Sequence, residues 1–221
     1  MSVGNGTYLD RIIAEHRVRA LADQRSVEQL FAEAVLLPET RGFRSSLSQP
    51  ALSVIAEIKR RSPSKGDLFV DLNPAVLARE YATGGAACIS VLTDEANFGG
   101  SQTDLEMARD AVKLPVLRKD FTVDERDVLD ARLMGADAVL LIVAALSKQE
   151  LERFFSLSGE LGLDALVETH DEAELETALE IGAELIGVNQ RNLITFEVDH
   201  ERAARMAELI PDDVIAVAES G

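Results

Sequence analysis

Lysines and carboxylates stand near the ends of several short apolar segments, and these are side chains that can move protons. The run "AEIKRRSPSKG" (56–66) holds Glu57 and Lys59 before a group of further cations, and later segments reach Lys119, Glu168 and Glu219. Lysine and glutamate side chains that meet in a site screened from water shift the pKa of one another. Enzymes use such groups as general acids and bases. The residue types therefore predict proton-transfer chemistry, provided that the fold brings them together.

Further polar side chains stand at comparable places along the chain. Glu57 and Lys59 are two residues apart, so on a strand their side chains leave the same face. We expect four more polar residues to reach that site: Arg118, Asn189, Arg191 and Ser220. A single charged residue at a strand end is more often an ordinary solvated loop residue. The convergence of five segments is what favours a catalytic site.

We expect these residues to be held by a set of β-strands. From Ala51 onward, short β-rich apolar runs alternate with polar loops and helical patterns. We predict strands at 53–59, 87–93, 115–119, 137–143, 165–169, 185–190 and 214–220. Several are nearly continuous apolar runs, which indicates burial on both faces, as in a parallel sheet covered by helices.

The alternation of strands and helices is typical of the α/β class, with parallel strands joined by right-handed crossovers. Such units form either an open doubly wound sheet or a closed (β/α)8 barrel. No G-x-G-x-x-G motif follows a predicted strand, which argues against a dinucleotide-binding fold. In a barrel, the carboxyl ends of all strands meet on one face, so the polar residues would lie together there.

Local signals mark where the helices begin and end. Asn73 before Pro74 is typical of a helix N-terminus, and Thr122 with Glu125 has the spacing of a capping box. Three glycines stand where a helix C-terminus favours a positive φ: Gly85, Gly135 and Gly182. Residues 1–50 contain helical patterns but no strand unit. We therefore predict an N-terminal helical extension (1–50) followed by the barrel domain (51–221).

The composition limits the classes of function. The chain has 221 residues, of which 39 are Asp or Glu and 22 are Lys or Arg, so the net charge is −17. Nucleic-acid binding needs a broad basic face, which this balance does not favour. The sequence contains no stretch of 18 uninterrupted apolar residues, so we predict no membrane span. The N-terminus has no signal-peptide pattern. We expect a cytoplasmic protein that binds neither nucleic acid nor membranes.

The positions of the cysteine and the histidines in the sequence do not predict a further functional site. Cys88 is the one cysteine and stands in an apolar run, so we interpret it as a core residue. His16 and His200 have no ligand-spaced Cys, His or Asp residues around them, which predicts no metal site. His170 follows Glu168 and precedes a helix, and we interpret it as a loop or cap residue.

Six segments together resemble the indole-3-glycerol phosphate synthase family. They are "SVIAEIKRRSPSKG", "PVLRKDF", "ADAVLLIVAAL", "ALVETHDEAELETAL", "IGVNQRNLITFEVD" and "VIAVAESG", and the likeness covers nearly the whole chain. The resemblance implies a (β/α)8 barrel, no cofactor and a small phosphorylated substrate, 1-(2-carboxyphenylamino)-1-deoxyribulose 5-phosphate. Such an enzyme is a carboxy-lyase of tryptophan biosynthesis that closes the pyrrole ring, releases CO2 and then dehydrates.

The resemblance also implies roles for individual residues. Lys119 would protonate the ketone oxygen, and we expect neighbouring cations to lower its pKa. Lys59 would hold the anthranilate carboxylate, and Glu168 would act in the dehydration with Glu57 and Asn189 orienting it. The remaining implied residues bind the sugar and its charged groups (Glu219, Ser220, Arg191), the phosphate (Ser62) or the aromatic ring (Phe98, Phe121, Leu140, Leu193), and Gly221 completes the binding set.

The sequence departs from the resemblance after the seventh predicted strand. Members of the family continue through an eighth strand unit, so we expect a C-terminally incomplete barrel with open edges, weakened phosphate binding and self-association through those edges. The alternative function is a non-catalytic barrel fragment that self-associates. An isomerase of the same pathway is a third reading, but Cys88 lacks an acidic partner at the matching strand end.

Overall fold

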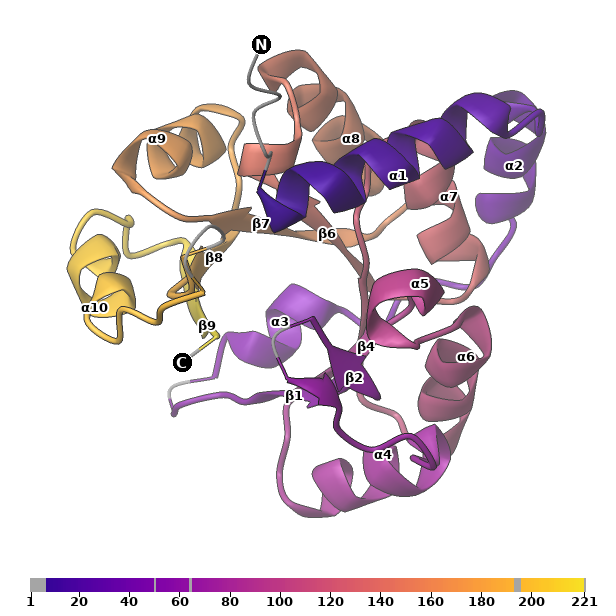
Figure 1. Ribbon diagram of the computed structural model, residues 1–221, viewed down its shortest axis with the longest axis horizontal. Helices are drawn as coiled ribbons and strands as arrows, with labels where there is room; N and C mark the ends of the chain where they lie inside the picture. The colour runs from indigo at the N-terminus through magenta and orange to yellow at the C-terminus, as the bar shows by residue number, and fades with distance from the viewer. Residues whose placement is uncertain (1–6, 50, 64, 193–195, 221) are drawn as a thin grey trace, which may run out of the picture.

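The computed structural model describes residues 7–49, 51–63, 65–192 and 196–220. Its centre is a curled sheet of seven parallel strands in the order β1-β4-β5-β6-β7-β8-β9, with helices around the outside (Figure 1). The strands are β1 (Ile55–Ile58), β4 (Cys88–Leu92), β5 (Val116–Lys119), β6 (Ala138–Ile142), β7 (Asp164–Thr169), β8 (Leu185–Asn189) and β9 (Ile215–Glu219). All seven predicted strands are confirmed, and β7 begins one residue earlier than predicted.

Alternate residues of each strand enter two different apolar layers. In β6, Leu140 and Ile142 face the inside of the curl, while Val139 and Leu141 pack with the surrounding helices. Among the described residues, the inner layer contains no α-helix from a βα unit, whereas a doubly wound sheet has helices on both faces. The sheet is therefore curled as in part of a barrel, and among the described residues its end strands β1 and β9 each have one neighbour.

The helices between the strands cover the outer face. They are α4 (Pro74–Thr83), α6 (Gln102–Ala111), α7 (Glu125–Leu133), α8 (Lys148–Glu160), α9 (Glu172–Glu180) and α10 (Arg202–Ala207), with the short α5 (Glu95–Phe98) and η1 (Val143–Ala145) after β4 and β6. A two-stranded hairpin that was not predicted, β2 (Arg61–Ser62) and β3 (Gly66–Asp67), lies in the loop after β1. No helix among the described residues is long and apolar enough to cross a membrane.

Most predicted helix ends are present. Asn73 caps α4, with Pro74 in the first turn. The predicted positive φ angles are present at all three glycines: 87° at Gly85, 84° at Gly135 and 78° at Gly182. The capping box predicted from Thr122 and Glu125 is wrong. Helix α7 begins at Glu125 and is capped by Asp124, whose partner is Asp127 in the third helical position, so the capping box lies two residues later than predicted.

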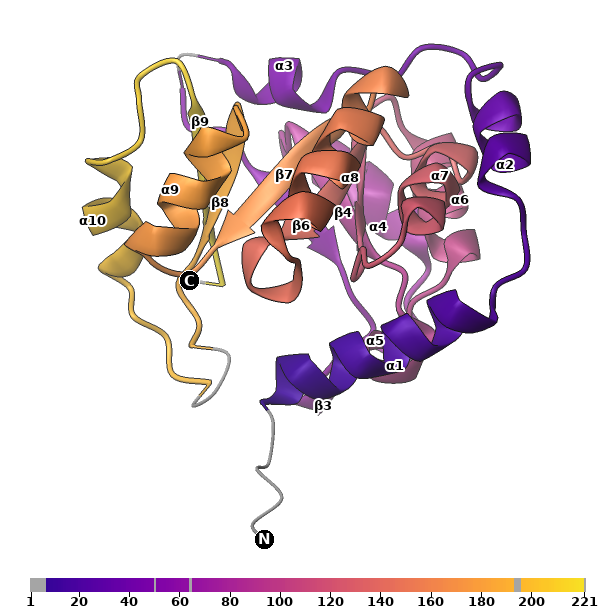
Figure 2. The same cartoon turned by 90° about the horizontal axis from the view of Figure 1, so that it is seen from above.

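The N-terminal helices reach both ends of the curled sheet. They are α1 (Tyr8–Ala22), α2 (Val27–Ala34) and α3 (Phe43–Leu47). Helix α1 lies at the carboxyl ends of the strands and α3 at the opposite end, as Figure 2 shows. Phe43 of α3 is fully buried in the inner layer, and the Cys88 thiol lies 3.5 Å from its carbonyl oxygen. Cys88 is thus a core residue, and burial raises its pKa to about 12. The division at residue 50 stays a prediction.

One buried carboxylate joins the N-terminal segment to the sheet. Asp137 precedes β6, and its side chain has no exposed surface. It accepts hydrogen bonds from the backbone N–H groups of Arg41 and Val116, both at 2.8 Å, and from Nη1 of Arg109 at 2.6 Å. Three donors from separate segments therefore depend on a single side chain.

Candidate active site

The ammonium group of Lys119 lies between two carboxylates at the carboxyl ends of the strands. Nζ donates to Oε2 of Glu168 at 3.1 Å and to Oε2 of Glu219 at 2.5 Å. Asn189 donates from Nδ2 to the other oxygen of Glu168 at 2.9 Å. These residues end or nearly end β5, β7, β8 and β9, so the curl of the sheet brings together side chains that are far apart in the sequence.

The pKa values in this cluster move in different directions. Burial alone would lower the pKa of Lys119, but the charges of Glu219 and Glu168 outweigh it, so the pKa is raised. Burial would raise the pKa of Glu168, but Lys119 together with His170 and Asn189 holds it below its ordinary value. For Glu219, burial dominates and raises the pKa to about 7. Glu168 is therefore ionised, and Glu219 is the group that takes up a proton near neutral pH.

The expected lowering of the Lys119 pKa is wrong. It assumed that cations would surround this lysine, whereas the groups in contact with it are carboxylates. An ammonium group between two anions keeps its proton more strongly than a free lysine does. Lys119 can still deliver a proton, but only when a ligand or a protonated Glu219 weakens its contacts with these carboxylates.

Glu57 and Lys59 form a second pair at the end of β1. Their side chains leave the same face, as predicted, and make an ion pair with one another. Both side chains are partly exposed. The charge of Glu57 contributes to the raised pKa of Lys119, which places the two pairs in one electrostatic environment.

Three aromatic rings pack together near the carboxyl ends of β4 and β5. Phe98 ends α5 and Phe121 follows β5, and their ring centroids are 6.2 Å apart. The ring of His16 in α1 packs against Phe121 at a centroid distance of 5.3 Å. Leu140 is buried in the inner layer, and Phe121 packs against that layer. Three of the residues predicted to line a ring pocket are therefore close together.

The remaining predicted binding residues are more dispersed. Ser62 lies in the β2–β3 hairpin, where its Oγ accepts a hydrogen bond from the Lys65 backbone at 3.3 Å. Ser220 follows β9, is exposed, and has a φ angle of 59° in the left-handed region. Leu193 and Gly221 lie outside the described residues.

Arg191 belongs to the loop that follows β8. Its backbone N–H donates to Oδ1 of Asn189 at 3.0 Å, and its Nη1 donates to the carbonyl oxygen of Phe196 at 3.0 Å. The first contact fixes the amide of Asn189, because its oxygen faces Arg191 while its nitrogen faces Glu168. Arg191 therefore supports the cluster through Asn189.

Arg118 does not point into the site, and the prediction that it does is wrong. It precedes Lys119 in β5, so its side chain leaves the opposite face of the strand. Its guanidinium group donates to the carbonyl oxygen of Asp127 at 2.6 Å and to Oδ2 of Asp120 at 3.1 Å. Arg118 thus connects the strand to the start of α7.

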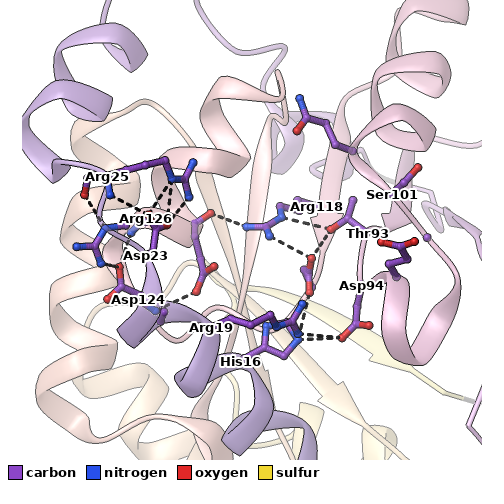
Figure 3. Close-up of a pocket in the computed structure, with 16 residues that line it drawn as sticks. His16, Arg19, Asp23, Arg25, Thr93, Asp94, Ser101, Arg118, Asp124 and Arg126 are labelled. Carbon is purple, nitrogen blue, oxygen red and sulfur yellow. Dashed lines mark hydrogen bonds and ion pairs between the residues drawn. The ribbon is translucent and has the colours of Figure 1, made fainter.

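A second polar cluster lies under α1, in a cavity of about 330 Å³ (Figure 3). Nε2 of His16 is 2.8 Å from Oδ2 of Asp94 and 3.9 Å from Oδ1 of Asp120. The absence of metal-ligand spacing around His16 was therefore a wrong reason to expect no metal, because the fold assembles a His-Asp-Asp group from distant segments. Asn97 and Thr93 already donate to these two carboxylates. The expected lack of a metal stays a prediction.

Two residues near the lysine cluster were missed or undervalued in the sequence. A Cβ atom on Gly187 in β8 would lie 2.0 Å from Oε1 of Glu219, so glycine is what admits this carboxylate. His170, interpreted as a loop or cap residue, lies against Glu168. The spacing of Glu168, His170 and Glu174 was a usable signal, since a strand end followed by a first helical turn can bring these residues together.

Comparisons with known proteins agree on one family. The family described as "Indole-3-glycerol phosphate synthase" matches residues 9–221. A protein of that name from Nocardioides sp. is 59% identical over 96% of this chain and 83% of its own length. The same name is carried by a protein of Chlorobium chlorochromatii that is 48% identical over 97% of this chain and 86% of its own length. A Streptomyces coelicolor relative, "Indole-3-glycerol phosphate synthase 2", is 50% identical over 93% of this chain and 78% of its own length.

A solved structure supports the fold. An N-acetylmannosamine-6-phosphate 2-epimerase from Clostridium perfringens superimposes with a TM-score of 0.52 over 65% of this chain and 66% of its own, at 12% sequence identity. This likeness concerns the α/β fold alone. The sequence relatives match nearly the whole of this chain, and they do not support the expectation that a C-terminal strand unit is lacking.

Proposed function

The chain belongs to the indole-3-glycerol phosphate synthase family, and from this premise we propose that it converts 1-(2-carboxyphenylamino)-1-deoxyribulose 5-phosphate to indole-3-glycerol phosphate, CO2 and water. The observation that carries the proposal is the position of Lys119 between Glu168 and Glu219 at the carboxyl ends of the strands. One proton donor and two carboxylates in a mostly buried site suit a reaction that first delivers and then removes protons.

Ring closure needs a proton at the ketone oxygen of the substrate. The ring carbon that bears the carboxylate attacks the ketone carbon, and the carbonyl electrons become an alkoxide, which is unfavourable in a site with little water. Lys119 holds its proton firmly, so it is fully protonated when the substrate arrives. We propose that the ketone oxygen replaces one carboxylate as its hydrogen-bond partner and takes the proton.

Loss of CO2 and dehydration follow on the same intermediate. Breaking the carbon–carboxylate bond releases CO2 and leaves its electron pair in the ring system. The new hydroxyl group then leaves as water, and a base removes a proton from the ring. Glu168 is ionised and held by Asn189, which supports it as this base. Lys119 gave its proton away in ring closure, so it must first regain one. Glu219 can supply it, because it contacts Lys119 and its pKa is raised to about 7, and Lys119 then gives this proton to the departing hydroxyl.

The substrate carries two anionic groups, and the cations near β1 complement them. Lys59 lies at the end of β1 with Glu57, which supports it as the partner of the anthranilate carboxylate. Ser62 lies in the hairpin that follows, beside Lys65, which supports a phosphate contact. Phe98, Phe121 and Leu140 offer an apolar surface to the aromatic ring.

The direct test is a fluorescence assay for indole-3-glycerol phosphate with the purified chain and this substrate. The proposal expects product at a rate proportional to enzyme concentration. A chain that gives no product, and that does not bind a reduced, non-reacting analogue of the substrate in a calorimetric titration, would leave only the non-catalytic alternative.

Gly187→Ala is expected to lower kcat by about tenfold or more. The added methyl group would occupy the position of Oε1 of Glu219, so this carboxylate must leave Lys119, and a hydrogen bond to a charged group contributes about 1.5–3 kcal/mol. Steady-state kinetics with the fluorescence assay measure the effect. Gly159→Ala is the matched control, since a Cβ there meets no atom within 4 Å. Equal kcat values for the two variants would contradict the assigned position of Glu219.

We also propose that the chain self-associates through the edges of its sheet. Two unpaired strand edges favour this alternative, in which the chain is a non-catalytic fragment that assembles with itself. Strands β1 and β9 each lack a second neighbour among the described residues, and Leu52 and Val54 before β1 are exposed. Unpaired strand edges bind other strands readily. Sedimentation velocity over a concentration series should show a dimer or larger species that increases with concentration. A single monomeric species throughout would refute this proposal without affecting the catalytic one.

A further inference from the structure

His170 approaches the oxygen of Glu168 that does not bind Lys119. Its Nε2 is 3.4 Å from Oε1 of Glu168, and its Nδ1 is 3.0 Å from Oε2 of Glu174. The backbone N–H of His170 also donates to this oxygen of Glu174, at 2.8 Å. The imidazole ring therefore stands between two carboxylates, one in the active site and one on α9.

Helix α9 fixes this arrangement. Asp171 caps the helix and accepts a hydrogen bond from the backbone N–H of Glu174, which places the Glu174 side chain at the first turn and turned back toward His170. An ionised carboxylate can only accept hydrogen bonds. Nδ1 of the ring must therefore carry a hydrogen toward Glu174, and Nε2 is left facing Glu168.

The environment of Nε2 decides the charge of the ring. This nitrogen is buried and has no hydrogen-bond partner among the described residues. In the neutral ring it would present a lone pair to the Glu168 carboxylate, which is repulsive, whereas in the protonated ring it presents an N–H group, which is attractive. Burial lowers the pKa of His170, but Glu168 and Glu174 outweigh it and raise the pKa to about 9, in agreement with the geometry.

We propose that His170, held in place by Glu174, is a cationic positioning residue that keeps the carboxylate of Glu168 ionised and turned toward Lys119. The inference rests on the proposed function and extends it, because Glu168 would otherwise depend on Lys119 alone for positive charge. When Lys119 gives its proton to the substrate it becomes neutral. The imidazolium then remains as the counter-charge that keeps Glu168 available as the base.

The charged groups around His170 support this assignment. Glu168 of β7 and Glu174 of α9 face the ring directly, while Lys119 of β5 contacts the other oxygen of Glu168 and Glu219 of β9 contacts Lys119. Without His170, the two active-site carboxylates share one lysine. We therefore expect its loss to raise the pKa of Glu168 and to weaken the base at the acidic end of the pH range.

The first experiment measures the ring itself and does not depend on activity. The chain has three histidines, so NMR titration of histidine-labelled protein, assigned with His170→Gln, gives a midpoint for each. We expect the His170 midpoint near 9, and in Glu174→Gln and in Glu168→Gln we expect it to fall by about one pH unit or more, a tenfold change in proton affinity. A midpoint at or below about 6.5 in the unmodified protein overturns the proposal.

The second experiment uses the pH dependence of kcat. His170→Gln is expected to lower kcat about tenfold near neutral pH, to leave KM within about twofold, and to move the acidic limb of the profile upward by about one unit. His200→Gln is the matched control, since His200 is exposed. A profile for His170→Gln that overlies the control overturns the proposal. If the chain shows no synthase activity, the proposed function fails, and the NMR midpoints alone decide the pairing of His170 with Glu168.

Discussion

Lys119→Met is expected to lower kcat by about 10²–10⁴-fold, which is the range that a positioned general acid contributes. The methionine side chain has similar length and fills the same space but carries no proton to donate. KM should change less than kcat, because the proposed role of Lys119 is proton delivery, whereas Lys59 and the hairpin after β1 are proposed to hold the anionic groups. The fluorescence assay for indole-3-glycerol phosphate measures both constants.

The control for this variant is Lys148→Met. Lys148 is an exposed lysine of α8 that pairs with Glu180, so its replacement removes the same charge from the chain at a position that does not contact the Lys119 cluster. We expect wild-type kinetics from it. A Lys119→Met enzyme that keeps more than about a tenth of the wild-type kcat would remove Lys119 from the role of general acid.

Lys119→Met should also change how the protein responds to pH. Without the ammonium group, Glu168 and Glu219 become two buried carboxylates close to one another, and the pKa of each rises. Both groups then bind more protons in the folded state than in the unfolded state, so the stability of the variant should fall as pH rises above the unfolded value of about 4.3. Urea unfolding at several pH values tests this trend.

Asp137→Ala is expected to lower the free energy of unfolding by about 3–5 kcal/mol, because it breaks a buried ion pair and leaves its partner unpaired. Asp137 is fully buried and holds Arg109 together with two backbone N–H groups, one of them from the segment before α3. Alanine leaves all three donors without their acceptor. The loss should appear as a lower urea midpoint with an unchanged slope.

Asp199→Ala is the matched control for that experiment. Asp199 pairs with Arg205 on the surface, where both side chains are well exposed, and exposed ion pairs contribute little to stability. A change in stability for Asp137→Ala that is as small as that of Asp199→Ala would show that the buried network does not join the N-terminal segment to the sheet.

The strands were predictable because their signal is local. A continuous apolar run such as 138–143 predicts a strand that is buried on both faces, whatever residues surround it. The same local reasoning failed at Arg118, which was expected to reach the site because it stands near the end of its strand, whereas its side chain leaves the face opposite to that of Lys119. It also failed at Thr122, where an aspartate pair two residues later provides the cap.

Periodicity along the chain was enough to predict the parallel α/β fold and the lysine and carboxylate residues at the strand ends. The contacts of Lys119 with Glu168 and Glu219, of His16 with Asp94, and of His170 with two carboxylates could be seen only in three dimensions. Ionisation depends on through-space distance and on burial, and neither quantity can be read along the chain. Residues separated by many positions acquire those properties only when the curled sheet brings them together.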